Sequence, residues 1–428
     1  MKNQLEKKNN KSNKNEGITL IALVVTIIVL LILAGISIQM LTGDNGILNR
    51  AAEAKENTEQ SQLEEQRRLA SMEAATNLTE TVYNYGEKEI KIPSGYAPTG
   101  IEGENKVEDG LVITDSKGNE FVWVEVPKDP NVYQTAGMDV NFTDDSDYLK
   151  IAKDLAVYSN SILSDNPTSL ADHLPLAGEG VQDYTNEYKD VLKSIYQNGG
   201  FWVGRYETGI QGTENATTSA RVGTNTGTEY PTEGNVAVIK ENVQSYTWVR
   251  WGQAQTLAQG FMPTTNNINH ANLLMGVQWD LVLKFIGKEK SVDSNSSDWG
   301  NYRDSVFSLK KGSHYAKYSS STLSTTWKAY NEDEAGFVEA SEKKGLESGN
   351  GILYTTGANI TQNSIKNICD IAGNVWEWTI ENTPTTSNPC SSRGGGYSFT
   401  GLEYPASGRR RGILSYSNSF VGFRVSLY

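Results

Sequence analysis

The chain has 428 residues, more than a single hydrophobic core usually holds, so we expect one large domain with additional segments. Aromatic residues make up 9% of the chain beside 40 Gly and 11 Pro, which is typical of a folded, turn-rich protein and argues against a disordered one. The net charge is -13, and because an acidic body repels polyanions, the charge argues against nucleic acid as a partner.

The chain begins with a basic leader followed by an apolar run. Residues 1–17 contain five Lys and two Glu, while the run from Ile18 to Met40 has no charged residue. As a helix the run would be about 35 Å long, enough to cross a bilayer core. We therefore predict a transmembrane helix at 18–41, with the leader in the cytoplasm and the residues after Asp44 outside the cell. The alternative, a cleaved secretory signal, is usually shorter and ends in small residues.

The order of Gly17, Ile18 and a long apolar helix resembles a type IV prepilin, whose leader is removed after the glycine by a membrane peptidase. The resemblance implies processing between Gly17 and Ile18. Pilins usually carry Glu at the fifth mature position, where it pairs with a neighbouring N-terminus, and this chain has Ala22 there. The resemblance therefore implies anchoring more than assembly into a major pilus. A plain N-terminal membrane anchor is the alternative.

A helical segment is predicted next. Residues 45–77 are rich in Ala, Glu, Gln, Leu and Arg and contain no Pro, a composition with high helix propensity. We predict a helical stalk at 42–78 and a linker at 79–86. The apolar residues are too sparse for a sustained heptad, so the sequence does not support a coiled coil.

From about residue 87 the pattern changes to short strands separated by turns. Strands are predicted at 90–96, 110–115, 120–126 and 200–209, and the turn at 115–119 joins the second and third as a hairpin. Helices are predicted at 146–164, 182–198 and 270–287. The Ser- and Asn-rich stretches 210–230 and 289–325 are predicted to be long surface loops.

Three motifs follow one another in the C-terminal part: DIAGNVWEWT at 370–379, RGGGYS at 393–398 and GFRV at 422–425. In this order they resemble the formylglycine-generating-enzyme-like (sulfatase-modifying factor) family, a branch of the C-type lectin fold. The resemblance runs over residues 87–428 and implies an α+β domain. We expect Trp376, Glu377, Trp378 and Arg424 to form core and a buried ion pair. Glycines are expected where a Cβ would not fit, at Gly373, Gly394, Gly395 and Gly422.

The same resemblance implies a protein that is not an enzyme. In the oxidase of the family, a Cys-x-x-x-x-Cys copper pair follows the glycine-rich turn, and this chain has Phe399 and Tyr404 at those positions. Neither side chain binds copper or carries a thiol redox step. Cys369 and Cys390 lie upstream of the turn and do not replace the pair.

The sequence predicts no cofactor. His173, His270 and His314 are far apart and have no cysteine companions, so a catalytic metal site is not expected. The resemblance allows a structural calcium ion, but no dense Asp/Asn loop is present to hold it. Outside the cell, Cys369 and Cys390 could form a disulfide that stabilises by about 3 kcal/mol in the chain-entropy model; the alternative is two buried free thiols.

The ligand-binding surface is predicted at 398–421. Aromatic and Arg side chains alternate there with small residues, as in antibody contact loops, where rigid rings give contact area at low entropy cost. Three consecutive arginines are predicted to form a positive patch for carboxylate, sulfate or phosphate groups. The alternative is an ordinary solvated loop. The predicted contact residues are Ser398, Phe399, Thr400, Leu402, Glu403, Tyr404, Arg409, Arg410, Arg411, Leu414, Tyr416 and Phe420.

Some lectin-fold proteins of this family are targets of diversity-generating retroelements, which rewrite adenines in a C-terminal cassette bounded by a Gly-Phe-Arg-like tail. This chain ends in such a tail at 422–428. The resemblance implies diversified positions at 398–400, 402–404, 408–414, 416 and 419–421, with 405–407 fixed between them.

Taken together, the patterns favour a surface-displayed, non-enzymatic receptor or adhesin that binds a protein or glycan ligand on another cell, host or phage surface. Its membrane contact would be the N-terminal helix, and pilin subunits are further candidate partners. Two alternatives remain: a minor pilin with a structural role, and an oxidase of the formylglycine-generating type.

Overall fold

The structure is a computed structural model of the chain, and it describes residues 20–42, 47–163, 169–176, 182–223, 235–262, 270–287, 291–305, 309–310, 312–319, 322–330, 351–358 and 364–428. It forms two compact units, Met1–Glu65 and Gln66–Tyr428. The predicted processing site at Gly17 and Ile18 lies outside the described residues.

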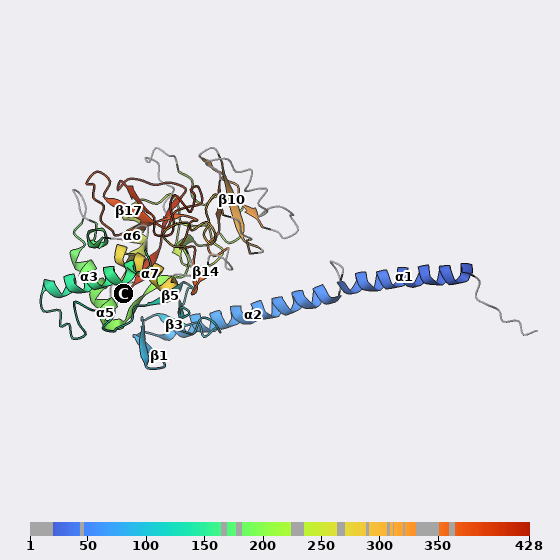
Figure 1. The fold of residues 1–428 in the computed structure, drawn as a ribbon, viewed down its shortest axis with the longest axis horizontal. Helices are drawn as coiled ribbons and strands as arrows, with labels where there is room; N and C mark the ends of the chain where they lie inside the picture. The colour runs from blue at the N-terminus through green and yellow to red at the C-terminus, as the bar shows by residue number, and fades with distance from the viewer. Residues whose placement is uncertain are drawn as a thin grey trace, which may run out of the picture. The chain divides into compact units, whose positions relative to one another are not determined.

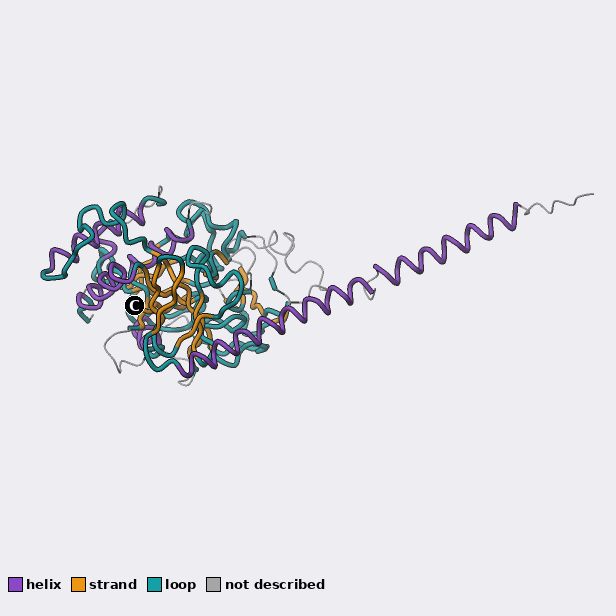
Figure 2. The backbone as a smooth tube through the Cα atoms, turned by 90° about the horizontal axis from the view of Figure 1, so that it is seen from below, coloured by secondary structure: helices purple, strands orange, loops and turns teal. Residues whose placement is uncertain are grey.

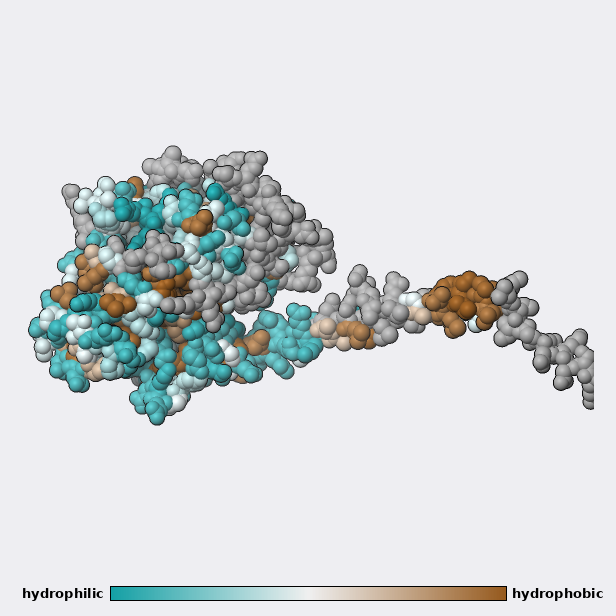
Figure 3. Space-filling view, viewed as in Figure 1, coloured by the Kyte–Doolittle hydropathy of each residue, from teal (hydrophilic) through white to brown (hydrophobic). Residues whose placement is uncertain are grey.

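The first unit contains helix α1 (Leu20–Thr42) and most of helix α2 (Ile47–Thr76). α1 exposes a series of large apolar side chains between Leu23 and Leu33, and Figure 3 shows them as an apolar surface along the helix. Within the described part of the chain, no helix meets the length and apolar character needed to cross a membrane. The predicted span at 18–41 therefore finds no support in the structure and stays a prediction. The predicted helix at 45–77 is confirmed by α2.

The second unit is built around a six-stranded antiparallel sheet in the order β3-β4-β5-β6-β20-β9. Its strands are β3 (Tyr96–Pro98), β4 (Val112–Asp115), β5 (Glu120–Glu125), β6 (Gly200–Gly204), β9 (Ala271–Leu273) and β20 (Val425–Leu427). The predicted hairpin is confirmed as β4 and β5. The last strand of the chain is inserted between β6 and β9, so the C-terminal tail is part of the central sheet, and Figure 2 shows strands surrounded by helices and loops.

The described residues of this unit form five helices beside the end of α2. They are α3 (Asp145–Asn160), α4 (Leu170–His173), α5 (Thr185–Asn198), α6 (Trp251–Gln259) and α7 (Gly276–Ile286). Asp144 caps α3 by accepting from the Ser146 N–H at 2.8 Å, and Gly199 ends α5 in the left-handed region with φ 75°. The helices predicted at 146–164 and 182–198 are confirmed, with shorter bounds.

The helix predicted at 270–287 is wrong at its start. Residues Ala271–Leu273 form β9, which pairs with β20, and the helix begins only at Gly276. The apolar periodicity of α7 continues into β9 in the sequence, but the backbone hydrogen bonds with a distant strand decide the conformation there.

A second, four-stranded sheet holds the three motifs. Its order is β18-β17-β16-β19, with β16 (Trp376–Thr379) and β19 (Val421–Phe423) parallel and β17 (Cys390–Arg393) and β18 (Arg409–Gly412) antiparallel to their neighbours. β19 is followed within two residues by β20 of the central sheet. The two sheets are therefore connected at Arg424.

Short strands complete the unit. They are β1 (Thr81–Tyr85), β2 (Lys88–Ile92), β7 (Gly209–Ile210), β8 (Ala237–Val238), β10 (His314–Ser319), β11 (Thr322–Leu323), β12 (Lys328–Ala329), β13 (Gly351–Tyr354), β14 (Ser364–Ile365) and β15 (Ile368–Cys369). The prediction of a surface loop at 289–325 is wrong. Trp299 and Tyr302 are buried, and β10 pairs with β11, β12 and β13.

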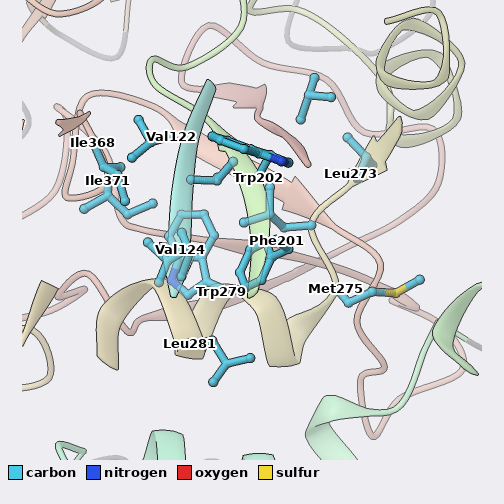
Figure 4. Packing of buried hydrophobic residues seen from close by; sticks show 14 of the residues in the cluster. Val122, Val124, Phe201, Trp202, Leu273, Met275, Trp279, Leu281, Ile368 and Ile371 are labelled. Atoms are coloured by element: carbon cyan, nitrogen blue, oxygen red, sulfur yellow. The ribbon is translucent and has the colours of Figure 1, made fainter. Parts of the chain in front are cut away.

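The hydrophobic core lies between α7 and the central sheet. Figure 4 shows Trp279 of α7 between the helix and the strands, near Val124 of β5 and Phe201 of β6. All three side chains are buried in one apolar cluster. Trp279 also donates its Nε1–H to the Ala406 carbonyl at 3.0 Å, which ties the core to the predicted binding segment.

The predicted buried ion pair is confirmed. Arg424 Nη2 lies 2.7 Å from Glu377 Oε1, and both side chains are at most 1% exposed. Arg424 also donates to the carbonyls of Gly204 and Cys369, each at 2.8 Å. Glycine is needed at Gly373 (φ 75°) and Gly395 (φ 79°), where a Cβ would collide with neighbouring atoms, as predicted.

We predict that Glu377→Leu and Arg424→Leu each lower the free energy of unfolding by about 3–5 kcal/mol, because each leaves one buried charge without its partner. The double variant should cost less than the sum of the two single variants, since neither charge remains. Chemical denaturation measures all three, with the exposed Lys153→Ala as the control. Strictly additive losses would contradict the prediction.

Candidate functional site

The predicted contact residues lie in β18, an edge strand of the four-stranded sheet, and in the connections on either side of it. Ser398 and Phe420 are buried, at 7% and 8% exposure, whereas Leu402 is 68% exposed. Of the others, Glu403 and Arg411 are exposed and the rest are half-buried. The segment is therefore packed on the fold and has an exposed rim, and its use as a binding surface stays a prediction.

An aromatic cluster of Trp376, Phe399, Tyr404 and Phe420 forms the centre of this surface. The ring centroids of Phe399 and Tyr404 are 5.1 Å apart, and those of Trp376 and Tyr404 are also 5.1 Å apart. Phe399 further contacts Phe420 at 5.6 Å, and every pair is edge-to-face. Edge-to-face pairs each add about 0.5–1.5 kcal/mol beyond the buried area. Phe399 and Tyr404, which the resemblance places at the positions of the copper cysteines, are thus rings that contact each other.

Arg410 covers the cluster. Its guanidinium lies 4.9 Å from the Phe420 ring centroid, 5.3 Å from that of Tyr416 and 5.7 Å from that of Phe399. Nη2 donates to the Tyr416 hydroxyl at 3.2 Å. Such contacts hold a guanidinium in place without neutralising its charge.

Three polar atoms here have no hydrogen-bond partner among the described residues: Arg410 Nη1, Trp376 Nε1 and Ser398 Oγ. All three groups carry a hydrogen that they can donate. A buried donor without a partner costs about 1–3 kcal/mol, so an acceptor group of a ligand would be favoured at any of them.

The predicted patch of three arginines does not form, because alternate residues of β18 point to opposite faces of the sheet. Arg409 pairs with Glu381, Nε to Oε1 at 2.5 Å, and with Asp280 at 3.5 Å. Arg410 faces the aromatic cluster, and Arg411 is exposed. Arg409 therefore holds the segment in place, and only its two neighbours are available to a ligand.

The partners of Arg409 belong to a buried charge network that the sequence did not reveal. Asp280 of α7 pairs with Arg393 of β17 and lies 2.8 Å from His173 Nε2. Burial by itself would raise the pKa of Asp280, but Arg393 and the hydrogen bond with His173 hold it well below its ordinary value. The network fixes α4, α7, β17 and β18 to one another. Nothing in the sequence connects His173 with Asp280, since they are far apart along the chain.

A cluster of buried acids lies near the ion pair. Glu207 accepts from the Val375 N–H at 3.0 Å and from Asn374 Nδ2 at 2.8 Å. Asp370 accepts from the Tyr354 hydroxyl at 3.1 Å and the Gly357 N–H at 2.6 Å. Burial raises the pKa of Asp370 to about 6, and burial with the nearby Asp370 charge raises the pKa of Glu207 well above its ordinary value.

A metal site is not evident in this cluster. In the segments that the structure describes, no group of three or more His, Cys, Asp and Glu side chains is arranged to hold a metal ion. The donors around Glu207 and Asp370 are backbone and side-chain groups of the fold itself. We interpret the acids as structural, and the calcium ion that the resemblance allows is not assigned to them.

The two cysteines are free and buried, so the disulfide is not formed and the alternative of two buried thiols is the one observed. Burial raises the pKa of both Cys369 and Cys390 to about 12. Because the thiolate is the nucleophile and the metal ligand, neither cysteine is suited to redox chemistry at neutral pH.

Comparisons with known proteins agree with the geometry of the C-terminal part. Residues 308–427 match the sulfatase-modifying factor enzyme 1-like domain (FGE-sulfatase), and this segment holds all four strands of the second sheet. The match supports the predicted formylglycine-generating-enzyme-like fold there, and the mixed helix and sheet architecture agrees with the predicted α+β class. No curated protein sequence matches the chain.

Two solved structures are similar to parts of the chain. Treponema denticola variable protein 1 is 15% identical, with 53% of this chain and 84% of that chain covered and a TM-score of 0.26. A crystal structure of CarF is also 15% identical, with 53% of this chain and 85% of that chain covered and a TM-score of 0.28.

The raised pKa of Asp370 predicts a pH-dependent stability. A carboxyl group whose pKa is higher in the folded chain than in the unfolded chain contributes its full stabilisation when the pH is below the unfolded pKa. For Asp370 that contribution is lost as the pH rises through its folded pKa of about 6. Between about pH 4 and about pH 7, the free energy of unfolding of the native chain should therefore fall relative to that of Asp370→Asn. Urea denaturation across this range measures the difference, and a difference independent of pH would contradict the assignment.

Proposed function

We propose that this chain is a surface-displayed, non-enzymatic ligand-binding protein, a receptor or adhesin, whose contact surface is the segment 398–421. The proposal rests on the residue pair Phe399 and Tyr404. These residues stand where an oxidase of the resembling family has its copper thiols, and their rings contact each other at 5.1 Å within the aromatic cluster.

The chemistry of the site supports binding over catalysis. The chain has two cysteines, both are buried outside the cluster, and burial raises the pKa of each thiol to about 12. A copper-dependent oxidation of a substrate cysteine needs thiolate ligands, which soft metal ions such as copper(I) prefer. The side chains at these positions offer two aromatic rings and the Tyr404 hydroxyl instead.

Backbone hydrogen bonds also hold this surface in place in the absence of a ligand. The Gly401 N–H donates to Ser297 Oγ at 3.0 Å, and the Tyr404 N–H donates to the Thr400 carbonyl at 3.0 Å. Rings held in this way lose little entropy on binding. Leu402, Glu403 and Arg411 on the exposed rim would make the outer contacts, and Arg410 would meet an acceptor of the ligand with its unpartnered Nη1.

The burial pattern supports diversification of this segment. Pro405, Ala406 and Ser407, which we expect to be fixed, are buried, while most of the flanking positions expected to vary are half-buried or exposed. The Ala406 N–H donates to Ser296 Oγ at 2.9 Å, which anchors the fixed stretch. A constant anchor between variable positions would allow side chains to change without loss of the fold.

Display at the cell surface rests on the N-terminal sequence. The proposal is that the basic leader is removed between Gly17 and Ile18 and that the apolar helix anchors the chain, with the second unit outside. The partner would be a protein or glycan on another cell, host or phage surface. N-terminal sequencing of this protein, purified from the membrane fraction, identifies its first residue. A chain that still begins with Met1 would argue for an uncleaved N-terminal membrane anchor.

The enzymatic alternative is tested by incubating the purified protein with copper and a cysteine-containing peptide. We expect no conversion of the peptide cysteine to formylglycine, as measured by mass spectrometry, and the variant Phe399→Ala should behave in the same way. Turnover by the native chain that is lost in the Phe399→Ala variant would overturn the proposal.

Diversification is tested in the DNA that flanks the coding sequence. We expect a reverse-transcriptase gene and a near-copy of the codons for residues 393–424 that differs mainly at adenines, at the positions given above. If related strains carry these codons with no more variation than the rest of the gene, the surface is a fixed one and the retroelement part of the proposal fails.

A further inference from the structure

A second concave site lies on elements that the segment 398–421 does not reach. A hollow of about 320 Å³ is lined by residues of α5, β5 and β6 and by the last two residues of the chain. Figure 1 shows the C-terminus near α5 and β5, whereas β17 of the second sheet lies in another part of the domain. No residue of 398–421 lines this hollow.

The wall of the hollow contains an unsatisfied indole. Trp123 of β5 and Trp202 of β6 are cross-strand partners with ring centroids 5.0 Å apart. Trp202 donates its Nε1–H to the Lys91 carbonyl at 3.2 Å, but Trp123 is 2% exposed and its Nε1–H finds no partner among the described residues. Since a buried N–H without an acceptor is costly, a ligand oxygen in this hollow would offset that cost.

An adjoining hollow of about 510 Å³ shares Asp190, His270 and Tyr428 with the first. The rings of His270 and Tyr428 stack at 5.5 Å with an interplanar angle of 25°. A stacked aromatic pair therefore stands where the two hollows meet. We refer to the two hollows together as the α5 groove.

The charges of the α5 groove exclude an anionic ligand. The first hollow is lined by two lysines and two acidic residues, Glu80 and Asp190. The second is lined by Asp183, Glu187 and Asp190, with no Lys or Arg among its lining residues. A carboxylate or phosphate would meet no net positive charge, and the acidic side would repel it.

The uncharged polar side chains of the α5 groove can form hydrogen bonds with hydroxyl groups of a ligand. Gln197 and Asn198 line the first hollow, and Asn186 and Asn272 are among the amides of the second. A side-chain amide both donates and accepts, as a sugar hydroxyl does. The apolar C–H face of a pyranose ring packs on an aromatic ring, and the half-buried rings of His270 and Tyr428 lie at the junction of the two hollows. Both volumes fall in the range of small-ligand sites.

We propose that the α5 groove binds a neutral oligosaccharide, with one sugar unit in the first hollow, on the side of the Trp123 Nε1–H, and a neighbouring ring beside the stacked His270 and Tyr428. Asn198 donates to and accepts from hydroxyl groups in the first hollow. The site is independent of the contact surface at 398–421, and its occupancy does not require that surface.

The test uses the full chain in a detergent without a sugar headgroup. Maltotriose, cellotriose and tri-N-acetylchitotriose are titrated, with saturation-transfer NMR and tryptophan fluorescence as readouts. We expect at least one trisaccharide to bind saturably. Asn198→Ala and His270→Ala should each weaken this binding about tenfold, which corresponds to the loss of about 1.4 kcal/mol of contacts.

Two matched controls locate the binding. Lys153→Ala on the exposed side of α3 and Arg410→Ala in the aromatic cluster should leave the affinity unchanged, and near-UV circular dichroism checks that each variant is folded. Three results would overturn the proposal: none of the trisaccharides binds, the groove variants bind as the native chain does, or Arg410→Ala removes the binding. Sialyllactose, which carries a carboxylate, should bind more weakly than the neutral sugars.

Discussion

The buried pair of Arg424 and Glu377 determines how the two sheets of the large unit are joined. Glu377 is in β16 of the second sheet, and Arg424 is the residue between β19 of that sheet and β20 of the central sheet. The remaining donors of Arg424 go to carbonyls of Gly204 and Cys369, so one guanidinium connects the end of β6, β15 and β16. A charge buried this deeply is tolerated only with its partner and its hydrogen bonds in place, so the pair fixes the geometry of the junction.

The position of the segment 398–421 depends on this junction and on a second set of charges. Trp376 and Trp378 are neighbours of Glu377 in β16, and their rings contact Tyr404 and Tyr416 of the segment. On the other side, Arg409 is held by Glu381 and Asp280. The segment is therefore fastened to buried elements through Tyr404, Arg409 and Tyr416. That arrangement would let the exposed rim carry different side chains while the frame beneath it stays the same, as the proposed recognition surface requires.

The two sites that we propose for recognition lie on different elements of the large unit and differ in their chemistry. The segment 398–421 presents ring edges, a guanidinium and unpartnered donors, which favour a ligand with acceptors. The α5 groove is acidic to neutral and rich in amides, which favours hydroxyl groups. A receptor or adhesin with both would hold a surface partner through the first site and a saccharide through the second. Contacts at two sites on one chain would add avidity without strengthening either contact.

Local patterns in the sequence determined the hairpin of β4 and β5 and helices α2, α3 and α5, because turn signals and composition act over short distances. The buried pair of Glu377 and Arg424, 47 residues apart, was predicted from the family resemblance of the motifs that contain them. The tertiary structure alone decided that 271–273 is a strand and that β10 lies within 289–325, since their partners are distant in the chain. It also decided that Arg409 is neutralised while Arg410 faces the rings. Because side chains alternate along a strand, the sequence places Arg409 and Arg410 on opposite faces of β18. Only the positions of Asp280 and Glu381 in the structure show which of these faces carries the buried ion pairs. The α5 groove has no motif at all, because its residues come together only when β5, β6, α5 and the last two residues of the chain meet in space.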